Sequence, residues 1–467
     1  MKIARSRFTP LALCSLLLAV CVPVFAQQRG NDPEAAAAVR NAVADMGGRA
    51  PVPVNKVVIG SASDVVFDAD TGAVVGGSGT ASINHNTANS TSQSGNDDQF
   101  NIGHRRHNTS NIDGLITVAT FDGAFVAQAG PEAGNDFRFT MLGNDPRLGD
   151  ATVFPINIDE VSLQLLNGDG SVFQTVSFDP FEKVTLESPN FEPLDYRSGH
   201  NVEFGDAVHR AQFFNIMKND WHTLLIPKVV NKVTITVPRF VNVRLSNGNV
   251  VQARAYFTGT AADGSTFVLM LRPLFNFFFD NEVINEINIG NFNTNAMNTT
   301  MFPNTYLFNL NVNNPNVPGG CCVLGFHTYF LDGVFPESRW VTQYASWISP
   351  GIFGGGFVDV TALSHELAET FGNPFISNPA PNWQFPGEPA NSKVCQNNLE
   401  EGDPIEVVAN ATAPTEVKER GFSFTYHPQN IPLLQWFEMG ATSSAIDGAF
   451  SFPDETVLPH SAIPCPQ

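Results

Sequence analysis

Short alternating runs of apolar and polar residues dominate the chain between residues 115 and 271. Asn-Gly, Gly-Asp and Asp-Pro pairs separate these runs, and such pairs favour tight turns. Alternation over about four to eight residues between turn signals is typical of half-buried β-strands. We therefore predict strands at residues 115–121, 137–142, 161–166, 172–178, 233–237, 241–245, 251–257 and 266–271.

Helical spacing of apolar residues replaces this alternation in two places before residue 350. The first is residues 206–218, and the second is residues 339–348, where Trp340, Tyr344 and Trp347 are spaced as on one face of a helix. Both stretches predict helices. Between them, residues 284–318 are dominated by Asn with Gly and Pro, and residues 321–327 predict a strand. The chain shows no repeat of fixed period, which argues against a solenoid.

The clearest helix prediction covers residues 359–372. Asp359 follows a Gly-rich turn and is a good N-cap residue, while Gly372 followed by Pro374 is typical of a helix end. Within these limits the apolar residues recur at helical spacing, which predicts that one face packs against a core.

The first 26 residues have the pattern of a secretory signal peptide. A cationic start precedes a short apolar segment, and Val24-Phe25-Ala26 is a small-residue cleavage site. A lipoprotein signal ending at Cys21 is the alternative. We predict a signal peptide at 1–26, a linker with weak strands at 27–114 and one large domain at 115–467, in a protein that is secreted or periplasmic.

Composition and charge narrow the classes of partner. The chain has 467 residues, 39 of them Phe, and only 15% are charged, which favours a β-rich, well-buried interior. Its formal net charge of −20 disfavours nucleic acids and anionic lipids as partners. No segment after the signal is apolar over the length that crosses a bilayer, so we expect no membrane insertion.

Four cysteines remain after the signal peptide, and an even number in an exported chain predicts two disulfides. Adjacent cysteines rarely pair, because the ring they close is strained. We therefore expect Cys321 and Cys322 to reach Cys395 and Cys465, in either arrangement. A four-cysteine zinc site is the alternative, although the spacing contains no C-x-x-C pair.

The predicted helix 359–372 carries His365, Glu366 and Glu369. His365 and Glu369 are four residues apart, so an imidazole and a carboxylate on one helix face can converge on one ion. Glu366 is next to His365 and can reach a water on that ion. The arrangement is that of an H-E-x-x-H metalloprotease helix with Glu369 in place of the second histidine. The alternative is an exposed amphipathic helix with His and Glu on its wet face.

A catalytic metal site needs a third protein ligand and an open position. The segment Leu399-Glu400-Glu401-Gly402-Asp403 offers Glu400 as that ligand, with Asp403 as a partner that orients His365 or a neighbouring ligand. The alternative for this segment is an acidic surface turn. Two further candidate ligands follow from residue type alone: His327 and His427.

These motifs resemble those of a family of secreted bacterial zincin-like metallopeptidases, which have an HE-x-A-E helix and a later E-x-G-D turn. In the helix they are also similar to the Exordium-like, phosphate-induced proteins of plants. The resemblance covers roughly residues 130–467. It implies an α+β zincin-like fold with a β-rich first half, and a metal-dependent peptidase activity.

Carried over by position, the resemblance implies that His365, Glu369 and Glu400 hold one zinc ion or another divalent cation, and that Glu366 is the general base. The substrate would be a peptide or protein. Proximity in sequence, apart from the resemblance, makes Tyr426 or His427 a candidate for stabilising the oxyanion. The second histidine of a typical zincin helix is missing, and oxygen-rich ligation also suits Mn²⁺ or Ca²⁺. A catalytically silent binding or cell-surface protein is the alternative function.

Overall fold

In the computed structural model, the described residues are 58–59, 65–69, 73–76, 115–195, 201–333, 336–354, 356–388, 395–406, 408, 410–419, 422–440, 457–463 and 465. The predicted signal peptide and most of the predicted linker lie outside these residues. Among the described residues, no helix is long and apolar enough to cross a membrane.

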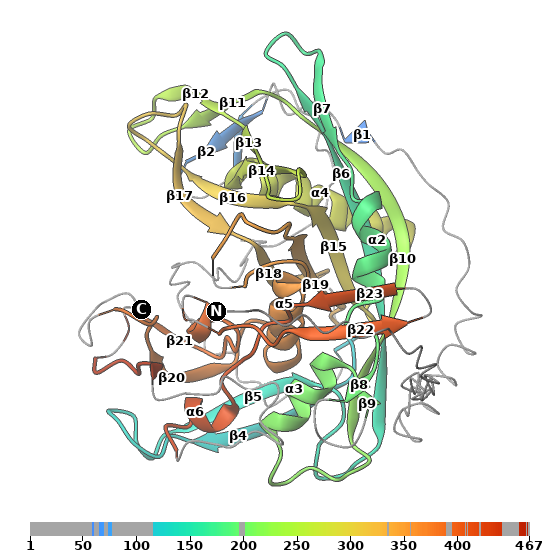
Figure 1. Cartoon of the computed structure of the whole chain (residues 1–467). Helices are drawn as coiled ribbons and strands as arrows, with labels where there is room; N and C mark the ends of the chain where they lie inside the picture. Colours follow the sequence, from blue (N-terminus) through green and yellow to red (C-terminus); the bar gives the residue numbers. More distant parts are fainter. Residues whose placement is uncertain are drawn as a thin grey trace, which may run out of the picture.

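The molecule is rich in β-structure. Strands make up 43% of the described residues and helices 17%. These residues form twenty-three strands but only five α-helices. After residue 290, α5 (Thr361–Gly372) is the one described helix longer than a single turn. The strands belong to several curled sheets (Figure 1). The prediction of an α+β zincin-like domain is therefore wrong.

A seven-stranded sheet forms the centre of the molecule, in the order β1-β10-β6-β15-β19-β18, with β7 paired to β6 outside this order. Within this order, neighbouring strands run parallel, except that the edge strand β18 is antiparallel to β19. Strand β7 is antiparallel to β6. Their bounds are β1 Val58–Ile59, β10 His222–Val237, β6 Ala151–Leu166, β15 Met297–Pro303, β19 Arg339–Trp347, β18 Gly325–Leu331 and β7 Val172–Val176.

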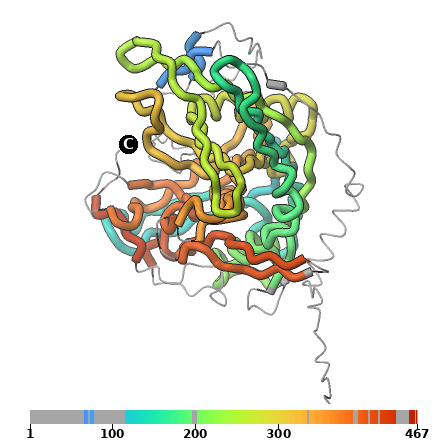
Figure 2. The backbone as a smooth tube through the Cα atoms, turned by 45° about the horizontal axis from the view of Figure 1, so that its top comes forward, coloured from blue at the N-terminus to red at the C-terminus, as the bar shows by residue number. Residues whose placement is uncertain are grey.

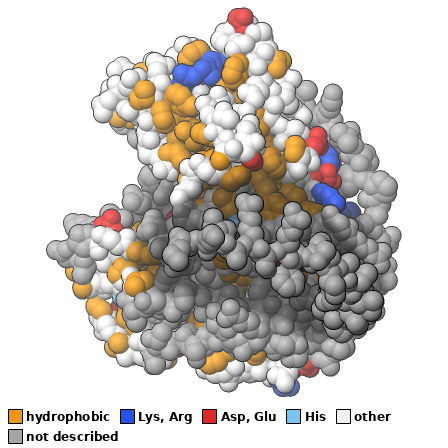
Figure 3. All heavy atoms as spheres, viewed as in Figure 1, with side chains coloured by type: hydrophobic (Ala, Val, Ile, Leu, Met, Phe, Trp, Pro, Cys, Tyr) orange, Lys and Arg blue, Asp and Glu red, His pale blue; other side chains and the backbone are white. Residues whose placement is uncertain are grey.

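Two four-stranded sheets lie in the upper left part of the view in Figure 1, beside the upper ends of β6 and β7. One has the order β12-β11-β2-β3, with bounds Val250–Arg254, Phe240–Arg244, Val66–Asp68 and Val74–Gly76. The other has the order β13-β14-β16-β17, with bounds Tyr256–Thr260, Thr266–Leu271, Thr305–Leu310 and Pro318–Val323. Figure 3 shows hydrophobic side chains gathered on this upper part of the molecule.

Hairpins and short helices complete the lower half. The hairpins are β4–β5 (Thr120–Val126 and Asp136–Leu142), β8–β9 (Leu194–Asp195 and Asn201–Val202), β20–β21 (Pro379–Trp383 and Gln396–Asn398) and β22–β23 (Thr415–Glu419 and Phe422–Tyr426). The helices are α2 Asp179–Leu186, α3 Phe204–Gln212 and α6 Leu434–Phe437. The hairpin β22–β23, red in Figure 2, packs on α2, where the Tyr426 hydroxyl donates to the Val184 carbonyl oxygen at 2.6 Å.

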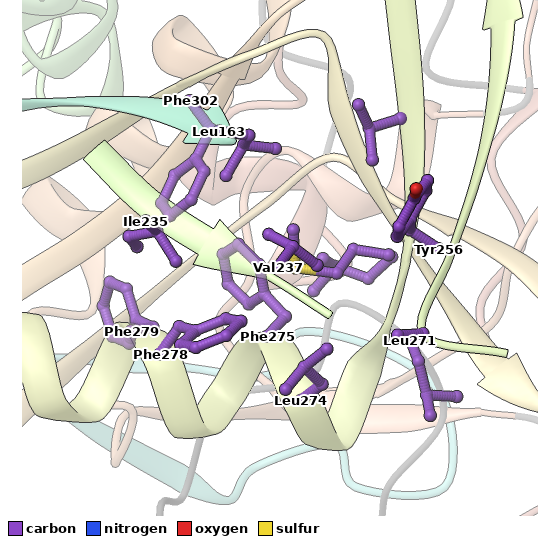
Figure 4. Packing of buried hydrophobic residues seen from close by; sticks show 14 of the residues in the cluster. Leu163, Ile235, Val237, Tyr256, Leu271, Leu274, Phe275, Phe278, Phe279 and Phe302 are labelled. Atoms are coloured by element: carbon purple, nitrogen blue, oxygen red, sulfur yellow. The ribbon is translucent and has the colours of Figure 1, made fainter. Parts of the chain in front are cut away.

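Helix α4 (Arg272–Ile289) contributes three buried phenylalanines to the aromatic core of the upper half. Figure 4 shows Phe275, Phe278 and Phe279 pointing from α4 into this core. The Phe275 ring lies 4.4 Å from the Tyr344 ring and 4.8 Å from the Phe302 ring, measured between centroids. The many phenylalanines of the sequence are thus used as interlocking rings between a helix and a sheet.

Helix α5 packs against neighbours on all sides. Leu363, Leu367 and Phe371 belong to the core beneath the central sheet, whereas Ala368 faces α3. All twelve residues of α5 are buried. The predicted helix end at Gly372 is confirmed, but the helix begins at Thr361 and Asp359 does not cap it, because the Asp359 carboxylate binds His427 instead.

The predicted helix at 339–348 is wrong, because this segment is strand β19. Tyr344 faces the α4 core while Val341 and Ala345 face the α5 core. A strand buried on both faces shows no apolar–polar alternation, so its large residues can imitate helical spacing. The predicted helix at 206–218 is confirmed in its first half, as α3.

The cysteine pairing also differs from the prediction. Cys321 pairs with its neighbour Cys322 at the end of β17, and Cys395 pairs with Cys465. The expectation that Cys321 and Cys322 reach the two distant cysteines is therefore wrong.

His209 on α3 provides a pH-dependent contribution to stability. Its ring is buried between aromatic side chains, and neither ring nitrogen has a hydrogen-bond partner among the described residues. Burial lowers the pKa of His209 from 6.5 to about 3. Between about pH 6.5 and pH 3, His209 is therefore protonated in the unfolded chain but neutral in the folded chain. The free energy of unfolding falls as the pH falls below about 6.5.

At about 1.4 kcal/mol per pKa unit, acidification from pH 6.5 to pH 5 is expected to lower the free energy of unfolding by about 2 kcal/mol through this residue. Urea unfolding of the wild type and of His209→Leu at both pH values measures the effect. The variant should lose this part of the pH dependence, and an unchanged slope would contradict the assignment.

Candidate metal centre

The predicted site helix brings its polar residues into the interior rather than to the surface. His365 is 3% exposed, Glu366 1% and Glu369 0%. The alternative of a solvent-exposed helix face is therefore excluded. Buried titratable groups of this kind need partners or a bound cation to offset their desolvation.

His365, Glu369 and Asp403 form one set of converging ligand atoms. The His365 Nε2 atom lies 3.2 Å from Glu369 Oε2 and 3.7 Å from Asp403 Oδ1, and all three atoms lie within 4.8 Å of one another. Asp403 is the last residue of the Glu-Gly-Asp sequence and the first residue of a 3₁₀ turn, Asp403–Ile405. The structure thus brings Asp403, which we predicted as an orienting partner, into the set of ligand atoms.

Gln429 fixes the orientation of the His365 ring. The Gln429 side-chain Nε2 donates to the Gly402 carbonyl oxygen at 2.7 Å, which turns its Oε1 atom toward His365 Nδ1 at 3.1 Å. Because an amide oxygen only accepts, His365 Nδ1 must carry a proton and donate it. The Nε2 atom of the ring then faces two carboxylate oxygens, an arrangement that a cation between them would stabilise.

Each carboxylate of the site has one oxygen held by amide donors and the other directed into the cluster. Glu369 Oε1 accepts from the backbone N–H groups of Gly402 at 2.9 Å and Asp403 at 3.3 Å. Asp403 Oδ2 accepts from Gln396 Nε2 at 3.0 Å. Glu369 Oε2 is buried with no hydrogen-bond partner in the described residues. Such outer hydrogen bonds are what hold metal ligands in position.

His327 on β18 extends the cluster. Its Nδ1 atom lies 3.4 Å from Glu369 Oε2 and 3.7 Å from Glu366 Oε2, and these three residues form a second set of ligand atoms within 4.8 Å. Its Nε2 atom lies 3.6 Å from Glu400 Oε2. The predicted ligand Glu400 therefore faces His327, and its other oxygen accepts from Asn398 at 2.5 Å.

The buried charges shift the protonation equilibria of these groups. Burial alone lowers the pKa of His327, but the carboxylates of Glu400, Glu366 and Glu369 outweigh burial and hold that pKa well above its usual value. Burial alone raises the pKa of Glu369, yet the imidazoles of His365 and His327 hold it well below the usual range. Glu369 therefore stays ionised at neutral pH and available as a ligand.

Two glycines make room for the site. A Cβ atom at Gly402 would overlap the imidazole of His365, and a Cβ atom at Gly325 would overlap the carboxylate of Glu366. The glycine of the Glu-Gly-Asp turn therefore allows the turn to lie directly against α5. The glycine of β18 allows the edge strand to do the same from the other side.

The two residues predicted to stabilise an oxyanion lie elsewhere. The Tyr426 hydroxyl donates a hydrogen bond to the Val184 carbonyl oxygen on α2. His427 Nδ1 lies 2.7 Å from Asp359 Oδ2, which ties it to the segment before α5. Neither residue belongs to the cluster of ligand atoms.

A pocket opens beside the cluster. Its volume is about 360 Å³ with the space at its mouth included, and both His365 and Glu366 line it. The other lining residues are mainly apolar: Cys322, Val323, Leu324, Gly325, Phe357, Thr361 and Ala362, with Glu406 and Gln429. The pocket thus gives a ligand a route to one side of the buried cluster.

No family model matches the sequence, and neither a curated protein nor a solved structure is significantly similar to the chain. The resemblance to secreted zincin-like metallopeptidases therefore stays a prediction that rests on the two motifs. The geometry of the site has to carry the functional argument by itself.

The sequence did not single out His327 among the histidines, and it gave no signal for Gln429. His327 was one of two histidines named from residue type alone, and nothing in its local spacing distinguishes it from His427. Gln429 was not considered, because an amide has no signature in a metal motif. Only the pairing of β18 with β19 and the return of the chain after β23 bring these residues to α5.

Proposed function

We propose that the protein is an exported, metal-dependent hydrolase that cleaves peptide or protein bonds. The observation that carries the proposal is the convergence of one ligand atom each from His365, Glu369 and Asp403 within 4.8 Å of one another, beside a pocket. The disulfides support an oxidising compartment.

The donor set fits a divalent transition metal. His365, Glu369 and Asp403 would supply one nitrogen and two oxygens, with His327 as a further nitrogen next to Glu369. Zinc accepts such mixed ligands, and Mn²⁺ also suits an oxygen-rich set. When bound there, the ion would supply Lewis acidity and lower the pKa of a coordinated water.

Glu366 is the group best suited to proton transfer. It is adjacent to the ligand His365, its Oε1 atom lies 4.0 Å from His365 Nε2, and its side chain lines the pocket. It could accept a proton from the attacking water and return it to the leaving amine, as a general base and then a general acid. The apolar pocket wall would hold the substrate and exclude competing water.

Glu366→Gln is expected to keep the metal content of the wild type while hydrolysis falls about 10²- to 10⁴-fold, which is the usual contribution of a general base. Elemental mass spectrometry measures the metal, and a mixture of fluorogenic peptides measures hydrolysis. Glu203→Gln is a matched control, because it replaces a buried glutamate that directly precedes α3 and accepts from the Leu225 N–H.

Full activity of Glu366→Gln would exclude the proposed base. A wild-type protein that binds the metal but cleaves no peptide would instead favour the alternative function, a catalytically silent binding or cell-surface protein.

A further inference from the structure

A second group of buried polar side chains lies where α4 crosses the central sheet, outside the pocket and the histidine cluster. Asp159 on β6 is the register partner of Asn231 on β10 and of Thr300 on β15. Helix α4 adds Glu282 and Glu286, one turn apart. All five residues are at most 1% exposed.

Several oxygen atoms in this group have no hydrogen-bond partner in the described residues. They are both carboxylate oxygens of Asp159, both of Glu282, the Asn231 Oδ1 atom and the Thr300 Oγ1 atom. Buried polar atoms are almost always satisfied, so such a concentration on adjacent strands and one helix needs an explanation. Because these atoms include the amide oxygen of Asn231 and the hydroxyl of Thr300, repulsion between carboxylates does not account for all of them.

Glu286 accounts for the orientation of Asn231. It accepts hydrogen bonds from the side-chain amides of Asn231 at 2.8 Å, Asn285 at 3.2 Å and Asn291 at 2.6 Å. The Asn231 amide nitrogen is thereby used, and its oxygen is left as an acceptor. Glu286 thus acts as an anchor, whereas Asp159, Glu282, Asn231 and Thr300 supply the remaining oxygens.

The nearest described lysine does not neutralise these acids. Lys232 pairs with Glu160 at 3.2 Å and with Glu182 at 2.5 Å, and Glu160 follows Asp159 on the strand and so points to the opposite face of the sheet. Burial, followed by the mutual repulsion of the carboxylates, raises the pKa of both Asp159 and Glu282. The negative charge therefore requires either bound protons or a bound cation.

We propose that Asp159, Asn231, Thr300 and Glu282 bind a calcium ion. The set contains only oxygen atoms, and it mixes carboxylate, amide and hydroxyl oxygens in the way that calcium sites do. Magnesium retains several of its waters and suits a closely packed interior less well. Histidine and cysteine are missing from the set, which distinguishes it from the cluster on α5 and from a zinc site.

The ion would join three strands of the central sheet to α4, so its role is to hold the upper core against the sheet. This inference does not depend on the proposed hydrolase activity, because it concerns different residues and a different class of metal.

The test uses the full chain, stripped with a chelator and then given calcium alone. We expect one calcium per chain by elemental mass spectrometry and a rise in the thermal midpoint of about 5 °C, since a ligand that binds only the folded state stabilises it. Asp159→Asn and Glu282→Gln should each lose the bound calcium and the shift. Glu160→Gln, on the opposite face of the same strand, should retain both.

Wild-type protein that neither binds calcium nor gains stability from it would overturn the proposal, and would leave a group of carboxyls that share protons. This outcome can be read from the wild type alone, even if the Asp159 and Glu282 variants do not fold. Retention of calcium by both of these variants would overturn the assigned ligands.

Discussion

Glu369→Ala is expected to abolish metal binding at the α5 site. Glu369 Oε2 is the atom shared by both sets of converging ligands, close to His365 and to His327. Without it, each set keeps only two of its three ligands, so the bound metal should fall from near one ion per chain to nearly none. Elemental mass spectrometry after loading with zinc and dialysis measures the change.

The same substitution should also destabilise the protein without metal. It removes the acceptor of the Gly402 and Asp403 backbone N–H groups. Each buried donor left without a partner costs about 1–3 kcal/mol, so the loss of the acceptor for both donors should lower the free energy of unfolding by about 2–6 kcal/mol. Urea denaturation of the chelator-treated proteins gives this value.

Glu369→Gln separates the two roles of the residue. The glutamine keeps an oxygen for the two backbone donors but provides no second carboxylate oxygen. It should therefore lose the metal with a much smaller loss of stability. Normal zinc content in both variants would show that Glu369 is not a ligand, and zinc loss in Glu369→Ala alone would assign it a purely structural role.

Gly402→Ala is expected to disrupt the site through a single methyl group. The backbone of Gly402 is right-handed, with φ −82° and ψ −35°, so alanine is compatible with its conformation. The added Cβ atom would nevertheless overlap the His365 ring. Either the ring leaves its hydrogen bond to Gln429 or the turn carrying Asp403 moves away, and both changes separate the ligands.

We expect Gly402→Ala to lose most of its metal and about 1–3 kcal/mol of stability, as overpacking does elsewhere. Metal content and urea unfolding are the measurements. Gly354→Ala is the control, because no atom lies within 4 Å of a Cβ at that position and its φ is not positive. If Gly402→Ala behaves like Gly354→Ala, the close packing of the turn on His365 is not needed for the site.

The sequence allowed the helix of the site to be predicted, but not the fold around it. Residues 361–372 combine helical spacing with a clear end signal, and these are local properties. Strand β19 was predicted as a helix because both of its faces are buried. The pairing of Cys321 with Cys322 was excluded on the general ground that adjacent cysteines rarely pair.

The composition of the site shows the same limit. His365, Glu366 and Glu369 share one helix, so their proximity follows from spacing. Asp403 and Glu400 are only three residues apart, yet they face different histidines. Which of them approaches His365 depends on the direction of the turn after β21, and that direction depends on contacts with α5 that no local pattern contains.

The complete burial of α5 has a consequence for how this protein would diverge among species. A helix with a wet face tolerates change there, so a catalytic pair stands out among variable neighbours. Here every position from Thr361 to Gly372 is enclosed. Substitution at any of them disturbs packing or charge, so natural selection should hold the whole helix nearly constant. A comparison of related sequences would then show one uniform block, in which invariance marks enclosure as much as chemistry.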